Sequence, residues 1–218
     1  MGTVIAIDGP AASGKSSVAR ALAARLGFVY VNSGNFYRAL TWHFLSSRTN
    51  FDDPTDVDSA LAASGLSSHI EHGTTMVTVR GADPSAHFHD AEVNANVSRV
   101  AALGAVRVFL LERLRSLGND ANIVMEGRDI GSVVFPSTPF KFYLDAPASV
   151  RQSRREAQGM IDTVTQRDQA DSGRSLAPLC LAEGAQAIDT SEHDVEGVVS
   201  KIVSLLSEQG LSGKGIPT

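Results

Sequence analysis

The stretch Gly9-Pro10-Ala11-Ala12-Ser13-Gly14-Lys15-Ser16 decides the fold of this chain. It is a complete G-x-x-x-x-G-K-S loop between an apolar run at 4–7 and a helical pattern at 15–26, the strand–loop–helix context of a phosphate-binding loop. Backbone N–H groups and the helix N-terminus attract phosphate there. We expect residues 9–17, including Ser17, to bind a nucleoside triphosphate, with Lys15 on the β- and γ-phosphates and Ser16 on Mg²⁺. A plain glycine-rich turn would not need the Lys-Ser pair.

Apolar runs alternate with helical patterns along most of the chain. Strands are predicted at 4–7, 28–31, 122–126, 140–145 and 187–189, and helices at 15–26, 36–47, 100–117, 148–158 and 195–206. This alternation predicts the α/β class, with a parallel sheet between two layers of helices, a three-layer α/β/α arrangement. Ligands of such sheets bind at the carboxyl ends of the strands.

Residues 53–97 interrupt the alternation. Asp53-Pro54 begins a small helix that ends near Ser64, and residues 69–71 and 76–80 flank a turn at 72–75, which predicts a β-hairpin. We therefore expect one domain over 1–218 with an inserted lobe at 53–97. Residues 209–218 are predicted to be a frayed tail.

The charge balance narrows the class of ligand. The net charge is −5, which disfavours general nucleic-acid binding. Of 19 basic residues, 15 are arginine and 4 lysine. Arginine grips phosphate with two bonds, so this bias suits small phosphorylated ligands. A genomic preference for arginine explains the count equally well.

Nothing in the sequence predicts export or a membrane. There is no basic and apolar leader pattern at the N-terminus and no apolar run of about 18 residues. Cys180 is the only cysteine, compatible with a reducing compartment, and its apolar surroundings predict burial. We expect a cytoplasmic protein that acts as a monomer.

Three further polar clusters follow predicted strands or helices. They are Asn32-Ser33-Gly34-Asn35-Phe36-Tyr37-Arg38, then Glu126-Gly127-Arg128-Asp129-Ile130-Gly131, then the Arg167-Asp168-x-x-Asp171-x-x-Arg174 pattern. Each combines arginine with small or acidic polar residues.

With these clusters the chain resembles the bacterial cytidylate kinases, within the nucleoside monophosphate kinases of the P-loop class. The motifs G-P-x-x-S-G-K-S, S-G-x-x-Y-R, G-R-D-I-G-x-V-V-F-P, R-x-x-R-R and R-D-x-x-D-x-x-R-x-x-A-P-L occur in the order typical of that family and span nearly the whole chain. The segment 53–97 resembles its monophosphate-binding insertion, and 151–174 resembles its lid.

The resemblance implies a reaction and a set of roles. ATP with Mg²⁺ would phosphorylate CMP or dCMP to CDP or dCDP. Ser33, Asp171 and Arg167 would contact the ribose; Arg38, Arg128 and Arg174 would surround the monophosphate; and Ser98, Arg107 and Asp129 would read cytosine.

Cytosine chemistry suits the last three residues. A carboxylate such as Asp129 accepts from the N4 amino group, while an arginine and a hydroxyl donate to N3 and O2. Uracil presents a carbonyl at position 4, so it would leave polar groups unpaired. Asp129 could instead pair with Arg128 or hold Mg²⁺ through water, and Asp171 could pair with Arg167 or Arg174.

A lid is predicted after the strand at 140–145. Arg151, Arg154 and Arg155 fall at i, i+3 and i+4 of a helix and so share one side. With Lys15, Arg128 and Mg²⁺ they would shield the transferring phosphoryl group, because phosphoryl transfer depends mostly on positioning and electrostatics. Alone, such a triplet is also typical of a solvated helix face.

The chain departs from the family pattern in two places. Asn32 stands where the family usually has aspartate. Only residues 156–166 separate Arg155 from Arg167, where the family usually has a longer lid with a Lys-Gly step. Two alternatives follow: a P-loop kinase for another monophosphate such as UMP, or a nucleotide-binding regulatory protein weakened in catalysis.

The short lid leads to a testable hypothesis. If it closes incompletely, water reaches the donor phosphate, and futile ATP hydrolysis rises or turnover falls. We expect measurable ADP release from ATP in the absence of CMP. Comparing the ATPase rate with and without CMP checks this, and strict dependence on CMP would contradict it.

Overall fold

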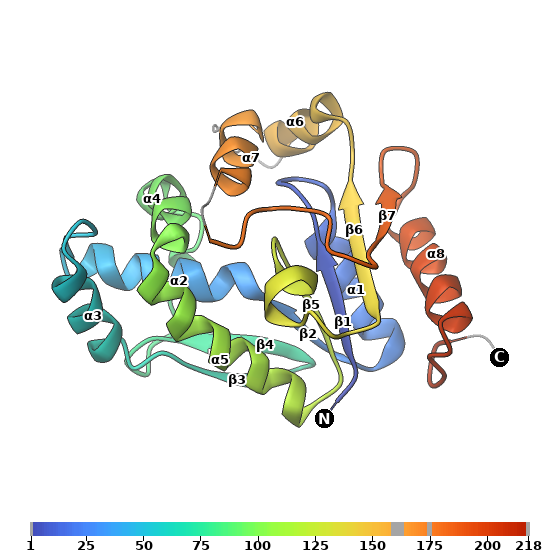
Figure 1. The fold of residues 1–218 in the computed structure, drawn as a ribbon, viewed down its shortest axis with the longest axis horizontal. Coiled ribbons are helices and arrows are strands. Elements are labelled where there is room, and N and C mark those ends of the chain that lie inside the picture. Colours follow the sequence, from blue (N-terminus) through green and yellow to red (C-terminus); the bar gives the residue numbers. More distant parts are fainter. Residues whose placement is uncertain (1, 158–163, 174–175, 217–218) are drawn as a thin grey trace.

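The computed structural model describes residues 2–157, 164–173 and 176–216. Its centre is a seven-stranded sheet in the order β3-β4-β2-β5-β1-β6-β7, parallel except for the β3/β4 pair (Figure 1). The strands are β1 (Val4–Asp8), β2 (Val29–Asn32), β3 (Ser67–Glu71), β4 (Thr74–Thr78), β5 (Ile123–Gly127), β6 (Phe140–Asp145) and β7 (Gln186–Asp189). The predicted α/β class is confirmed.

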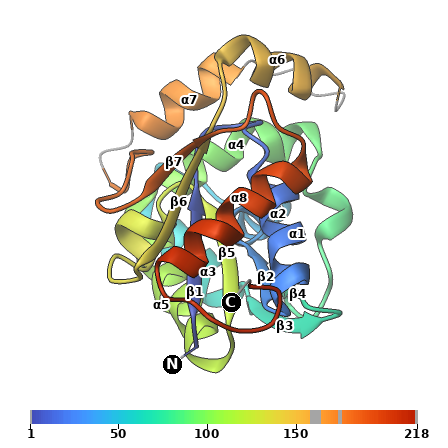
Figure 2. The ribbon, with the colours of Figure 1, turned by 90° about the vertical axis from the view of Figure 1, so that its right-hand side faces the viewer.

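Helices cover both faces of this sheet, as Figures 1 and 2 show. They are α1 (Lys15–Leu26), α2 (Ser33–Ser46), α3 (Pro54–Ala63), α4 (Ala91–Ala102), α5 (Gly104–Asp120), α6 (Ala148–Ala157), α7 (Val164–Ser172) and α8 (Val195–Glu208). A short 3₁₀ helix, η1 (Ser85–His87), and a short π-helix, η2 (Ile130–Val134), complete the set. Among the described residues no helix is both long and apolar enough to cross a membrane.

The central strands alternate between two cores. Ala6 of β1 packs into the core with α2, α3 and α5, whereas its neighbours Ile5 and Ile7 pack into the core with α1 and α8. β5 does the same, with Met125 on the first side and Val124 on the second. Because side chains of a strand point alternately to opposite faces, continuous apolar runs become strands buried on both sides.

The hairpin of the region 53–97 joins the main sheet, which the sequence did not predict. The helix of this region begins at Pro54 as predicted, and the Asp53 side chain caps it by accepting from the Thr55 N–H. The hairpin is also confirmed, but β4 pairs with β2 through Tyr30 and Thr74, so the hairpin extends the main sheet. The assignment of 53–97 as a monophosphate-binding lobe stays a prediction.

Two helix predictions were wrong. The helix expected at 100–117 is two helices, because Leu103 has extended backbone angles (φ −69°, ψ 123°) that end α4 and start α5. Most of α4 was not predicted, because polar residues separate its buried positions Val93, Val97 and Val100. The α2 helix begins at Ser33, three residues before the predicted start, directly after the end of β2. Cys180 is exposed, contrary to the prediction.

Packing on α5 gives a direct stability test. Leu110 is fully buried, while Val108, two residues away, is 69% exposed. Leu110→Ala is expected to lower the free energy of unfolding by about 2–5 kcal/mol, because it leaves a cavity in the core. Val108→Ala, the matched control, should change it by about 0.5 kcal/mol or less. Urea denaturation followed by circular dichroism checks both, and equal losses would contradict this packing.

Candidate active site

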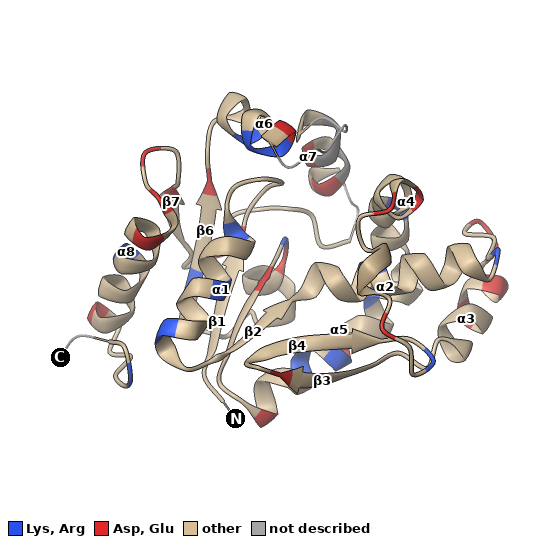
Figure 3. Cartoon of the chain, turned by 180° about the vertical axis from the view of Figure 1, so that it is seen from behind, with Lys and Arg blue, Asp and Glu red and all other residues tan. Residues whose placement is uncertain are grey.

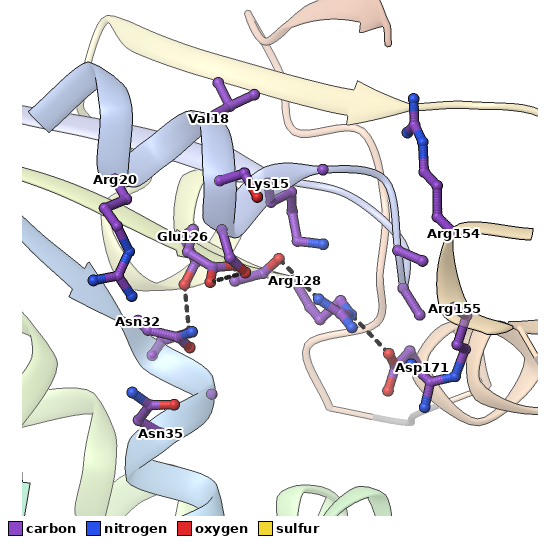
Figure 4. Close-up of a pocket in the computed structure, with 18 of the residues that line it drawn as sticks. Lys15, Val18, Arg20, Asn32, Asn35, Glu126, Arg128, Arg154, Arg155 and Asp171 are labelled. Atoms are coloured by element: carbon purple, nitrogen blue, oxygen red, sulfur yellow. Dashed lines mark hydrogen bonds and ion pairs between the residues drawn. The ribbon is translucent and has the colours of Figure 1, made fainter. Parts of the chain in front are cut away.

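A large cavity lies at the carboxyl ends of the central strands. Its volume is about 1270 Å³, and residues of the glycine loop, α2, α4, α6 and α8 and the segment after β5 line it. Figure 4 shows its central part, with Lys15 and Glu126 beside Arg128, and with Arg154 and Arg155 entering from α6. This is the edge at which ligands of parallel sheets bind.

The glycine loop has the backbone that its sequence predicts. Gly9 (φ +148°) and Gly14 (φ +90°) adopt conformations that favour glycine, and a Cβ on Gly9 would lie 2.0 Å from the Leu144 carbonyl oxygen. The α1 helix begins at Lys15, so its first N–H groups have no partner within the helix. These N–H groups and the positive end of the helix dipole form an anion-binding end.

Lys15 lies at the start of α1 and lines the cavity. It is buried, and its Nζ donates to the Pro10 carbonyl oxygen at 2.6 Å. Burial, together with the nearby Arg128 guanidinium, lowers the pKa of Lys15 to about 7. A bound phosphate would place more negative charge beside Lys15 and so favour its ammonium form.

Glu126, at the end of β5, is hydrogen-bonded to residues of both α1 and α2. Its Oε1 accepts from the Ser16 hydroxyl at 2.6 Å and from the Tyr30 hydroxyl at 3.2 Å, and its carbonyl oxygen accepts from Ser33 at 2.8 Å. Glu126 falls within one of the polar clusters of the sequence, but its role was not predicted. An acidic residue at the end of a buried strand beside a phosphate-binding loop was the signal that could have found it.

Two ion pairs form on the side opposite the loop. Arg107, from α5, donates through Nη2 to Asp129 and through Nη1 to the Ala101 carbonyl oxygen. Arg128 donates through Nε to Asp171 of α7 at 2.7 Å. Burial works against the charge of Arg128, but the Asp171 carboxylate outweighs it and raises the pKa of Arg128. Thus Asp129 pairs with Arg107.

The remaining predicted substrate residues lie around the same cavity where the structure describes them. Ser33, Arg38 and Ser98 line it. Arg38 donates through Nη1 to the Asn94 side chain at 2.8 Å, which links α2 to α4. The Arg167 side chain, Arg174 and residues 158–163 of the predicted lid lie outside the described residues.

The three lid arginines do not share one environment. Basic residues of α6 lie on the side of the helix that faces the rest of the molecule (Figure 3). Arg154 and Arg155 line the cavity, and Arg154 also donates to the Thr190 hydroxyl and carbonyl oxygens at 2.9 and 2.7 Å. Arg151 does not line the cavity: it donates to Asp168 at 2.6 Å and to the Ala11 carbonyl oxygen at 3.2 Å. Its direct catalytic role stays a prediction.

Asp8 holds the segment that carries Arg128 and Asp129. It is buried at the end of β1, and its two carboxylate oxygens accept from the N–H groups of Ile130 and Gly131 at 2.8 and 2.7 Å. These bonds fix the start of η2 against the glycine loop. Burial raises the pKa of Asp8 to about 6, although the two N–H bonds oppose that shift.

The fold and the cavity define a P-loop protein of the α/β class with a second arginine-rich region opposite the loop. The chain belongs to the cytidylate kinase family, whose family model matches residues 5–208. The cytidylate kinase of Streptomyces avermitilis is 36% identical over 94% of this chain and 93% of its own length. That of a Geobacillus species is 37% identical, covering 94% and 96%.

Solved structures agree at the level of the fold. An uncharacterised protein from Eubacterium ventriosum has a TM-score of 0.50 and 12% identity, covering 94% of this chain and 98% of its own. At that identity the likeness shows the fold alone.

The raised pKa of Asp8 gives a pH prediction. The folded protein retains a proton on Asp8 up to about pH 6, whereas the unfolded chain releases it near 3.8. Its contribution to the free energy of unfolding is therefore full below pH 3.8 and is lost as the pH rises through about 6. We expect wild type to lose stability relative to Asp8→Asn between these values. Urea unfolding at stepped pH checks this, and a flat or rising difference would contradict it.

Proposed function

We propose that this chain transfers the γ-phosphoryl group of ATP to CMP or dCMP, giving ADP and CDP or dCDP. The observation that carries the proposal is that the glycine loop and the Arg107–Asp129 pair line one cavity. The first is a triphosphate site, and the second offers donors and an acceptor to a base. Membership of the cytidylate kinase family supports the same reaction.

The acceptor base is read by Arg107, Asp129 and Ser98. The pair is largely shielded from water, since its side chains are only 10% and 7% exposed. Contacts with a base are therefore made in a site where an unpaired polar group costs about 1–3 kcal/mol. Cytosine meets the carboxylate with its N4 amino donor, whereas uracil meets it with a carbonyl.

Oxygen ligands suited to Mg²⁺ converge beside the loop. The Ser16 hydroxyl and the Glu126 carboxylate are 2.6 Å apart, and Mg²⁺ prefers hard oxygen ligands together with substrate phosphates. These two residues would hold the ion, Ser16 directly and Glu126 through water. When bound, Mg²⁺ neutralises charge on the donor phosphates.

The protein supplies positioning and positive charge. A phosphate monoester has a second pKa near 6, so the acceptor oxygen is largely ionised at pH 7 and needs no strong base. Lys15 and Arg128 approach the transferring group from the core, and Arg154 and Arg155 approach it from α6. Ser33, Asp171 and Arg167 hold the acceptor ribose, while Arg38 and Arg174 hold its phosphate. We place this activity in a cytoplasmic monomer.

A coupled assay that follows ADP release from ATP with CMP, dCMP, UMP or AMP tests the proposal. We expect kcat/KM for CMP to exceed that for UMP by about 100-fold, the size that a few kcal/mol of unpaired polar groups gives. A preference for UMP would favour the related kinase, and turnover with none of the four would favour a nucleotide-binding protein.

Asp129→Asn tests the base-reading role within that assay. An amide can donate to the uracil carbonyl, so kcat/KM for CMP should fall by about 10–100-fold while the preference over UMP narrows. Asp120→Asn, at the exposed end of α5, is the matched control and should leave both values unchanged. A uniform loss for CMP and UMP in Asp129→Asn would show that Asp129 only supports the structure.

A further inference from the structure

Tyr30 carries a polar group into the wall of the cavity. It lies on β2 with 2% of its surface exposed, and the Arg20 guanidinium lies 4.6 Å from its ring centre. Its hydroxyl donates to Glu126 Oε1 at 3.2 Å, and Asn32 Nδ2 donates to that hydroxyl at 3.4 Å. In Figure 4 Asn32 and Glu126 face each other at one end of the cavity, with Arg20 beside them.

Donor and acceptor counts give this chain of bonds a direction. A tyrosine hydroxyl has one proton to donate, and a side-chain amide nitrogen can only donate. Because Asn32 supplies a proton to the hydroxyl oxygen, the hydroxyl proton is directed to Glu126. Burial, together with the charge of Glu126, raises the pKa of Tyr30, so the hydroxyl stays protonated in the working pH range.

The two oxygens of the Glu126 carboxylate therefore have different hydrogen-bond partners. Ser16 and Tyr30 both donate to Oε1. Among the described residues these donors fix the rotation of the carboxylate and leave Oε2 for a partner from the cavity. A metal-bound water is such a partner, and residues that orient a metal's ligands strongly affect its affinity.

We propose that Tyr30 and Asn32 are positioning residues that orient the Glu126 carboxylate toward the water shell of the Mg²⁺ ion. The inference rests on the proposed function for the identity of the ion. It gives a reason for the amide at position 32. Aspartate there would be acceptor-only, would compete with Glu126 for the single hydroxyl proton, and would add a like charge beside it.

Manganese binding tests the proposal without turnover. Mn²⁺ would be titrated by electron paramagnetic resonance into the protein saturated with a non-hydrolysable ATP analogue. Tyr30→Phe and Asn32→Asp should each weaken Mn²⁺ binding by about tenfold, a loss typical when a residue that orients a metal ligand is removed. In the coupled assay the same variants should raise the Mg²⁺ concentration for half activity and leave the KM for CMP unchanged.

A double-mutant cycle with Glu126→Gln separates this role from a general structural one. If Tyr30 acts through Glu126, Tyr30→Phe should add less than twofold to the loss that Glu126→Gln already causes. Asn50→Asp, in an exposed loop, is the matched control and should bind Mn²⁺ as wild type does.

Three results would overturn the proposal: unchanged Mn²⁺ affinity in Tyr30→Phe, unchanged affinity in Asn32→Asp, or additive losses in the cycle. Asn32 is only partly buried at the cavity wall, so its variant keeps the test open if Tyr30→Phe fails to fold. Failure of wild type to phosphorylate CMP would count against the proposed function, while the Mn²⁺ titrations would still measure the coupling of Tyr30 and Glu126.

Discussion

The position of β5 between β1 and β2 is the constraint on which the rest of the site depends. In the parallel register Glu126 is opposite Ile7 of β1 on one side and opposite Asn32 of β2 on the other. The glycine loop leaves β1 two residues after Ile7, and α2 leaves β2 directly after Asn32. The glycine loop and α2 therefore emerge on either side of Glu126, and hydrogen bonds from Ser16 and Ser33 join both to that residue.

Buried charge is the second organising feature. Lys15, Arg128 and Arg155 are held close to the carboxylates Asp8, Glu126 and Asp171, and the neighbouring Arg107 pairs with Asp129. The shifts are opposite in sign: the pKa of Lys15 falls to about 7, whereas that of Arg128 rises because Asp171 faces it. A triphosphate in the glycine loop would add negative charge beside Lys15, where the helix N-terminus already attracts it.

Much of this arrangement was predictable from the sequence, and the reasons are local. The loop at 9–16 could be placed because its glycines, lysine and serine have fixed spacing between a strand and a helix. The partners of Asp129 and Asp171 could not be predicted, because Arg107 and Arg128 reach them from other elements. The split at Leu103, and the joining of β4 to β2, depend on contacts far apart in the chain. The roles of Arg167 and Arg174 stay predictions.

A kinase of this kind holds a donor and an acceptor nucleotide in one cavity at once. Calorimetric titration with a bisubstrate analogue, adenosine and cytidine joined through five phosphates, tests whether this cavity does so. We expect one analogue per chain, bound at least about 100-fold more tightly than ATP alone, because linking the two nucleotides makes the second binding event intramolecular. An analogue that binds no more tightly than ATP, or equally well with uridine in place of cytidine, would contradict a shared donor and cytidine-acceptor cavity.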